Sequence, residues 1–188
     1  IGDSAFYLCS SLTSVRFEPG SQLTSIGSNA FKALGLTSIT FPASLTSIGD
    51  SAFYLCSSLT SVRFESDSQL ETIDQFVFDS TGISSITLPS SLKSIGDVAF
   101  QSCSSLTSVS FESGSQLTMI GVKAFHWSGL SSITIPASVT SIGKQAFYQL
   151  SSLTSVSFIS GSQLEMIGEG AFQSSGLSGS ITLPASLT

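Results

Sequence analysis

Charged residues are scarce in this chain, which has 188 residues, six Lys and Arg, and twelve Asp and Glu. A nucleic-acid surface needs clustered basic side chains, so a net charge of −6 argues against DNA or RNA as a partner. No apolar run approaches the roughly 20 residues that a membrane-spanning helix needs. The hydrophobic fraction of 41% nevertheless argues against disorder and is enough to build one core.

Residues that carry chemistry are equally rare, since the chain has three cysteines, one tryptophan and a single histidine, His126. Catalysis generally needs a positioned acid, base or metal. Serine and threonine make up about a third of the chain, but no serine lies in a nucleophile-elbow pattern. We therefore predict a protein that is not an enzyme, with no cofactor and no metal.

The cysteines recur in one register: Cys9, Cys56 and Cys103 are 47 residues apart, and Leu150 holds the fourth position. Replacement by leucine indicates an apolar core position. If the units stack as coils, cysteines two coils apart are separated by about 9.6 Å, from a strand spacing of about 4.8 Å. A disulfide needs Cα atoms within about 7 Å. We predict three free, buried thiols and no disulfide.

An internal repeat decides the fold. The motif Ile-Gly-x-x-Ala-Phe, or a close variant, returns after alternating steps of 25 and 22 residues. Such a period indicates a solenoid of about eight coils. We expect one domain over residues 1–188, part of a longer array, with one extra residue near Gly179 absorbed as a bulge. The units are residues 1–25, 26–47, 48–72, 73–94, 95–119, 120–141, 142–166 and 167–188.

Three patterns within each unit predict its local structure. Leu-x-x-Val/Ile-x-Phe alternates apolar and polar residues and favours a short strand. Leu-x-x-Ile, before each Ile-Gly, predicts a second short strand on another face. The Ala-Phe segment predicts a short helical or 3₁₀ turn with its ring inward, after a glycine that supplies a permissive turn.

The combined pattern Leu-x-x-Val/Ile-x-Phe/Leu-Pro-x-x-Leu-x-x-Ile-Gly-x-x-Ala-Phe-x-x-Cys-x-x-Leu resembles the BspA-like leucine-rich repeats, also called the Treponema pallidum type, over essentially the whole chain. The resemblance implies a β-dominated leucine-rich repeat solenoid of the α/β horseshoe type, a right-handed curved stack with a parallel sheet on its concave face. It further implies a cell-surface or secreted protein that attaches to a protein or extracellular-matrix partner. Asn29 is the only asparagine, so we expect no asparagine ladder.

Alternation along the main strand places small hydroxyls and two arginines outward, with glutamates where the strands exit. This stripe is either an extended recognition surface or a set of side chains that only solvate the sheet. Its members are Ser14, Arg16, Glu18, Ser38, Thr40, Ser61, Arg63, Glu65, Ser85, Thr87, Ser108, Ser110, Glu112, Ser132, Thr134, Ser155 and Ser157.

Two further positions are interpreted from the residues that occupy the same position in the other repeat units. Trp127 aligns with residues of mixed character, which predicts partial exposure, as an interface anchor or packed against the neighbouring turn. His126 aligns with mostly hydrophilic residues, which predicts an exposed side chain on a surface turn.

We therefore expect a non-catalytic binding scaffold that uses the concave surface. The alternatives are a structural spacer in a longer surface protein and an ice-binding or surface-adsorbing solenoid, although arginine and glutamate interrupt the hydroxyl stripe. Neither terminal unit carries a polar cap, so apolar coil edges are expected to permit end-to-end self-association.

Overall fold

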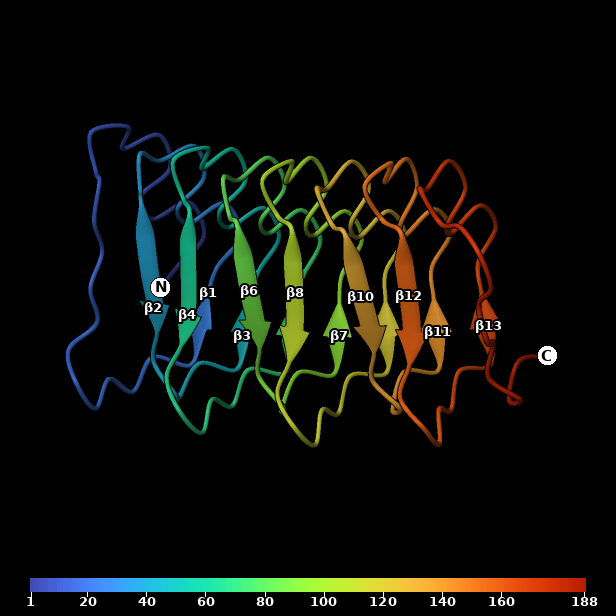
Figure 1. Ribbon diagram of the computed structural model, residues 1–188. Coiled ribbons are helices and arrows are strands. Elements are labelled where there is room, and N and C mark those ends of the chain that lie inside the picture. Colours follow the sequence, from blue (N-terminus) through green and yellow to red (C-terminus); the bar gives the residue numbers. More distant parts are fainter.

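The computed structural model describes residues 1–188 as a β-solenoid that winds along one axis (Figure 1). Its main strands lie in front in Figure 1 and its short strands lie behind them, running in the opposite direction. The short strands are β1 (Ser25–Ile26), β3 (Ser47–Ile48), β5 (Thr72–Ile73), β7 (Ser94–Ile95), β9 (Met119–Ile120), β11 (Ser141–Ile142) and β13 (Met166–Ile167). The main strands are β2 (Ser38–Phe41), β4 (Ser61–Phe64), β6 (Ser85–Leu88), β8 (Ser108–Phe111), β10 (Ser132–Ile135) and β12 (Ser155–Phe158).

Each strand pairs in parallel with its equivalent in a neighbouring coil, as the repeat predicts. The short strands form one seven-stranded sheet in the order β1-β3-β5-β7-β9-β11-β13. Its register joins like residues, for example Ile48 with Ile73. The main strands form a four-stranded sheet, β2-β4-β6-β8, and a two-stranded sheet, β10-β12, which together we call the main sheet. The prediction of a parallel solenoid with a second short strand on another face is confirmed.

The core lies between the two sheets and consists of 44 buried hydrophobic residues. The phenylalanines of the Ala-Phe motif point inward and stack as a column along the axis. Within it the ring centroids of Phe53 lie 5.2 Å from those of Phe31 and 5.6 Å from those of Phe78. Each ring therefore fills the space between the equivalent rings of the coils before and after it.

The prediction of eight coils was wrong, because a main strand forms in only six of the units. The missing ones fall in the first and last units, at residues 14–17 and 180–183. Each of these segments has a neighbour on one side only, and the main sheet is open at that junction, as described below. In the last unit, Gly179 at φ 79° adds an extra residue that shifts the segment further.

The predicted helical or 3₁₀ turns are also wrong, because the structure contains no helix. In residues 27–33, the N–H of Ala30 donates to Gly27 and that of Lys32 donates to Asn29, which gives the three-residue span of a 3₁₀ helix. However, Asn29 has φ 56°, and the N–H of Phe31 donates to the next coil. Left-handed residues and inter-coil hydrogen bonds thus break each helix into linked turns.

No helix of the structure is long and apolar enough to cross a bilayer.

The glycine of the Ile-Gly motif serves close approach between coils, whereas a permissive backbone conformation was expected. A Cβ on Gly121 would lie 2.6 Å from the carbonyl carbon of Gly96 in the preceding coil. At Gly2, in the first coil, an added Cβ meets nothing within 4 Å. A side chain at this position of the motif is therefore excluded only where a preceding coil packs against the glycine.

Candidate functional site

The predicted stripe forms one exposed face of the main sheet. In β2, β6 and β10 the side chains alternate strictly between exposed and buried. The outward side chains of the six main strands therefore lie on one side, while Ile39, Ile86 and their equivalents point into the core. Ser14 and Arg16 are exposed as well, although their segment is not a strand.

Some hydroxyls of this face bond to each other along the stack. The Oγ1 of Thr87 lies 2.9 Å from the Oγ of Ser110, and the same distance separates Thr134 from Ser157. Both pairs join strands that are fully paired through their backbones. At these positions the hydroxyls satisfy one another, as expected of residues that solvate a parallel sheet.

The main sheet is closed at one junction and open at the next. Strands β2 and β4, β6 and β8, and β10 and β12 are each joined through four residue pairs. In contrast, β4 and β6 share one pair, Ser61 with Ser85. Between β8 and β10 the ladder is interrupted, so they lie in separate sheets. The sheet therefore opens wherever a long unit is followed by a short unit.

A hollow marks every open junction, so the hollows follow the 47-residue period. The first, of about 450 Å³, is lined by Arg16 and Thr40. The second, of about 340 Å³, is lined by Arg63 and Thr87. Further hollows lie between β8 and β10 and between β12 and residues 180–186. The sequence predicted the stripe but not these hollows, because its spacing does not show which backbone pairs separate.

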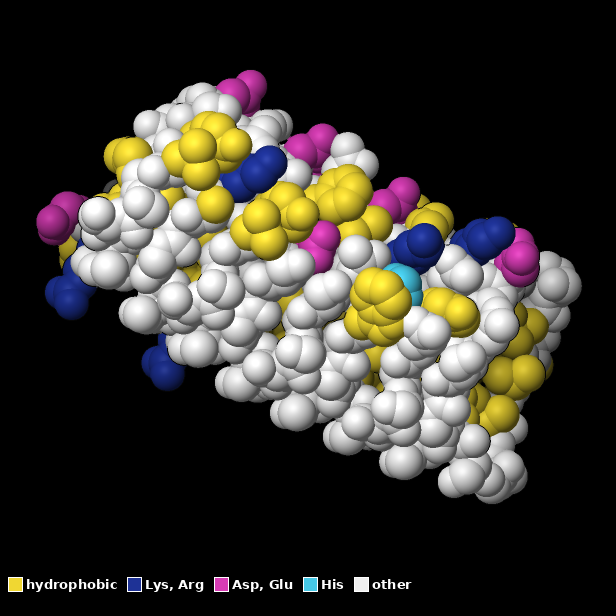
Figure 2. All heavy atoms as spheres, turned by 90° about the horizontal axis from the view of Figure 1, so that it is seen from above, with side chains coloured by type: hydrophobic (Ala, Val, Ile, Leu, Met, Phe, Trp, Pro, Cys, Tyr) yellow, Lys and Arg dark blue, Asp and Glu magenta, His cyan; other side chains and the backbone are white.

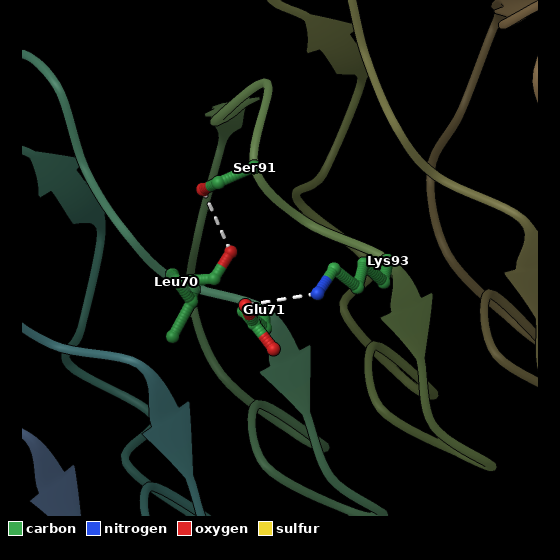
Figure 3. Close-up of polar contacts among 4 residues, drawn as sticks. All are labelled: Leu70, Glu71, Ser91 and Lys93. Atoms are coloured by element: carbon green, nitrogen blue, oxygen red, sulfur yellow. Dashed lines mark hydrogen bonds and ion pairs between the residues drawn. The ribbon is translucent and has the colours of Figure 1, made fainter.

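Arg16 and Arg63 are exposed cations without an ion-pair partner. The two ion pairs of the structure lie elsewhere. Lys93 Nζ is 2.9 Å from Glu71 Oε1 beside the short strands β5 and β7, where Ser91 also donates to the carbonyl of Leu70 (Figure 3). Lys144 Nζ is 2.7 Å from Glu169 Oε2. The guanidinium groups of Arg16 and Arg63 are thus free to contact a ligand.

The glutamates at the edge of the stripe contact the backbone of the preceding coil. Glu65 Oε2 accepts a hydrogen bond from the N–H of Ala43 at 3.1 Å, and Glu112 Oε2 accepts one from Ser90 at 3.0 Å. Ile159 occupies the equivalent position and offers no acceptor. Glu65 and Glu112, predicted as binding residues, therefore also fasten the Pro-x-Ser links.

Trp127 lies on another edge and is 53% exposed, as its register predicts. Its Nε1–H donates to Oε1 of Gln149 in the next coil. The prediction for His126 was wrong, because this residue is only 6% exposed. Trp127 and Tyr148 cover its ring, with centroids at 4.2 and 5.1 Å. Burial lowers the pKa of His126, which favours the neutral imidazole.

Two of the three thiols are buried, as predicted. The Sγ of Cys56 donates to the carbonyl of Phe31, and burial raises the pKa of each buried thiol to about 11. Cys9 is exposed, against the prediction, because no coil precedes its own in the structure. None of the cysteines forms a disulfide.

Comparison with known proteins gives a consistent result. The sequence model described as "BspA type Leucine rich repeat region" matches residues 1–107 and 71–188. No curated protein matches the chain.

Three solved structures are similar. The pneumococcal vaccine antigen PcpA is 29% identical, with a TM-score of 0.65 over 81% of this chain and 44% of its own. A leucine-rich cell surface protein of Faecalibacterium prausnitzii is 27% identical, with a TM-score of 0.52 over 77% of this chain and 45% of its own. The leucine-rich repeat protein of T. pallidum shares the fold at 24% identity, with a TM-score of 0.72 over 87% and 75%. The chain spans less than half the length of the first two.

Proposed function

Because the chain belongs to the BspA-type leucine-rich repeat family, we propose that it binds a protein or extracellular-matrix partner through the exposed face of its main sheet. The chain is a non-catalytic repeat scaffold. We take this face to be the concave side of the solenoid. The observation that supports the proposal most is the pair of unpartnered arginines, Arg16 and Arg63, each beside a hollow in the sheet.

The spacing of these arginines suits an extended partner. They lie two coils apart, which corresponds to about 10 Å along the axis. Solenoids generally use such repeated positions as one long surface, to which each coil contributes a weak contact. We also propose a cell-surface or secreted location, which is supported by two similar proteins, one a vaccine antigen and the other a cell surface protein.

A charge-reversal experiment tests the face. The double variant Arg16→Glu/Arg63→Glu should bind an immobilised extracellular-matrix extract about tenfold more weakly than the unaltered chain. The matched control Lys93→Glu/Lys144→Glu changes the net charge by the same amount on other surfaces and should bind nearly as well. Equal binding by both double variants would show that the main sheet is not the site.

A structural spacer is the second candidate, and the paired hydroxyls of Thr87 and Ser110 favour it because they satisfy each other. A spacer would bind no matrix component in the same assay. An ice-binding surface has less support, because the hollows interrupt the flat face. End-to-end self-association of the terminal coils stays a prediction, which sedimentation at increasing concentration tests.

A further inference from the structure

The Ala-Phe turns line up along one edge of the solenoid, at the top of Figure 1, which we call the turn edge (residues 120–128 and their equivalents). Figure 2 looks down on this edge and shows separate groups of hydrophobic side chains, one of them beside the single histidine. We propose that Trp127 on this edge is a stacking platform for a neutral carbohydrate chain of hexopyranose units. This site lies apart from the main sheet and does not depend on its function.

The fold does not require a tryptophan at position 127. All equivalent residues have a similar left-handed backbone, with φ 59° at both Leu8 and Ala33 and 56° at Ser102. Leucine, alanine, serine and glutamine therefore all serve the turn. A large ring that is 53% exposed contributes little to core packing. The tryptophan covers the ring of His126, but the turn itself forms equally with smaller residues at the equivalent positions of other coils.

The indole is held in place before any ligand arrives. The His126 ring stacks against it, with centroids 4.2 Å apart and planes 28° apart. Its Nε1–H is fixed by Gln149 of the next coil. Trp127 stays 53% exposed despite these contacts, so a large part of the residue is accessible to a ligand. Such preorganisation reduces the entropy that a ligand must overcome on binding.

The surroundings of the platform favour a sugar over a protein. At the position of Trp127 the preceding coil has Ser102 and the following coil has Gln149, so no apolar column continues at this position. Tyr148 extends the aromatic group only on the side of His126. Protein interfaces of standard size bury about 800 Å² per partner around a contiguous apolar centre. A hexopyranose instead offers one apolar C–H face and hydroxyls around its rim, which suits a single exposed indole with polar residues at the equivalent positions of both neighbouring coils.

Charge and hydrogen bonding also distinguish this turn. The direct contacts of the indole are the ring of His126 and the amide of Gln149, and neither places a carboxylate or an ammonium group against it, which suits an uncharged ligand. His126 Nε2 and Ser128 Oγ are buried without a hydrogen-bond partner. Buried polar groups are rarely left without a hydrogen-bond partner. The exceptions in natural proteins occur mainly at functional or strained sites.

Fluorescence tests the proposal directly, because Trp127 is the only tryptophan of the chain. The probes are three neutral hexamers: β-1,4-linked glucose, β-1,4-linked N-acetylglucosamine and α-1,4-linked glucose. At least one should change the emission of Trp127 saturably, with a dissociation constant of about 1 mM or below. Absence of any change with all three, up to about 10 mM, would overturn the proposal.

Variants separate stacking from a general effect on the turn. Trp127→Leu places here the residue found at Leu55, in an equivalent turn, and should weaken calorimetrically measured binding about tenfold. Trp127→Phe should retain part of the affinity, and Leu55→Ala should bind like the unaltered chain. Unchanged binding by Trp127→Leu, with an intact circular dichroism spectrum, would refute the platform. If no hexamer changes the emission of Trp127, and a protein partner binds the unaltered chain but not Trp127→Leu, the carbohydrate site is refuted and Trp127 is an anchor for a protein.

Discussion

The column of phenylalanine rings makes the cost of losing one ring predictable. Phe53 is fully buried, stacks on Phe31 and Phe78, and meets the edge of Phe41 at 5.5 Å. Phe→Ala substitutions in cores cost about 3–5 kcal/mol, and the cost rises when the cavity cannot collapse. Aromatic neighbours fix the walls here, so we expect Phe53→Ala to cost about 4–5 kcal/mol.

Urea and thermal unfolding measure this loss. For a domain of this size, 1 kcal/mol shifts the melting temperature by about 2–4 °C, so Phe53→Ala should melt about 8–20 °C lower. Circular dichroism and the fluorescence of Trp127, three coils away, should shift together if the column couples the coils.

The matched control is Phe6→Ala at the same position of the motif. Phe6 is 39% exposed and stacks on one ring only, that of Phe31. Its loss should cost about 1–2 kcal/mol. If Phe53→Ala destabilises the chain no more than Phe6→Ala, the ring column does not hold the coils together.

Other predictions concern close contacts, thiols and pH. Gly121→Ala should lower the free energy of unfolding in urea by about 1–3 kcal/mol, because the new Cβ would lie 2.6 Å from the carbonyl carbon of Gly96. Gly2→Ala should be tolerated, since its Cβ would meet nothing within 4 Å. Equal effects of the two substitutions would refute this reason. At pH 8, iodoacetamide should modify Cys9 alone in the folded chain, because burial raises the pKa of the other two thiols to about 11; rapid labelling of all three would contradict their burial. Burial raises the pKa of Asp79, so its ionised form destabilises the fold at neutral pH. Asp79→Asn should raise the urea midpoint at pH 7, and this gain should vanish as the pH falls below the ordinary carboxyl pKa; a constant gain would contradict the linkage.

The sequence predicts the stacking well because equal residues at equal spacing leave one register for the coils. Ile48 pairs with Ile73 as the motif requires, and the outward stripe follows from simple alternation. The second strand was also predictable, since Leu-x-x-Ile, or Val139-x-x-Ile142 in one unit, precedes the Ile-Gly motif after the first unit.

The conformation of the turns could not be predicted. Left-handed backbone is typical of glycine and asparagine, but here it also falls on Ala33, Ser102 and Trp127, which give no such signal. Burial of His126 was missed because the residues at the same position in other units are mostly hydrophilic. The side chain is buried by the rings of Trp127 and Tyr148, which pack against it.

The site was predicted only in outline. Alternation identifies which side chains face outward, but it does not identify acceptors that reach back to another coil. The carboxylate of Glu65, bonded to the N–H of Ala43, is one such acceptor. The hollows beside Arg16 and Arg63 depend on where the backbone hydrogen bonds between neighbouring strands are lost, which the repeat spacing does not show.

Cross-linking between engineered cysteines tests most directly whether like positions line up as columns on the main sheet. In a chain whose Cys9 is replaced by serine, Thr87→Cys/Ser110→Cys joins neighbouring paired strands, where the Cα spacing of about 5 Å suits a disulfide. We predict rapid oxidation of this pair and none for Thr87→Cys/Thr134→Cys, two coils apart. Equally fast oxidation of both pairs would contradict the stacked coils, and with them the proposed extended binding face.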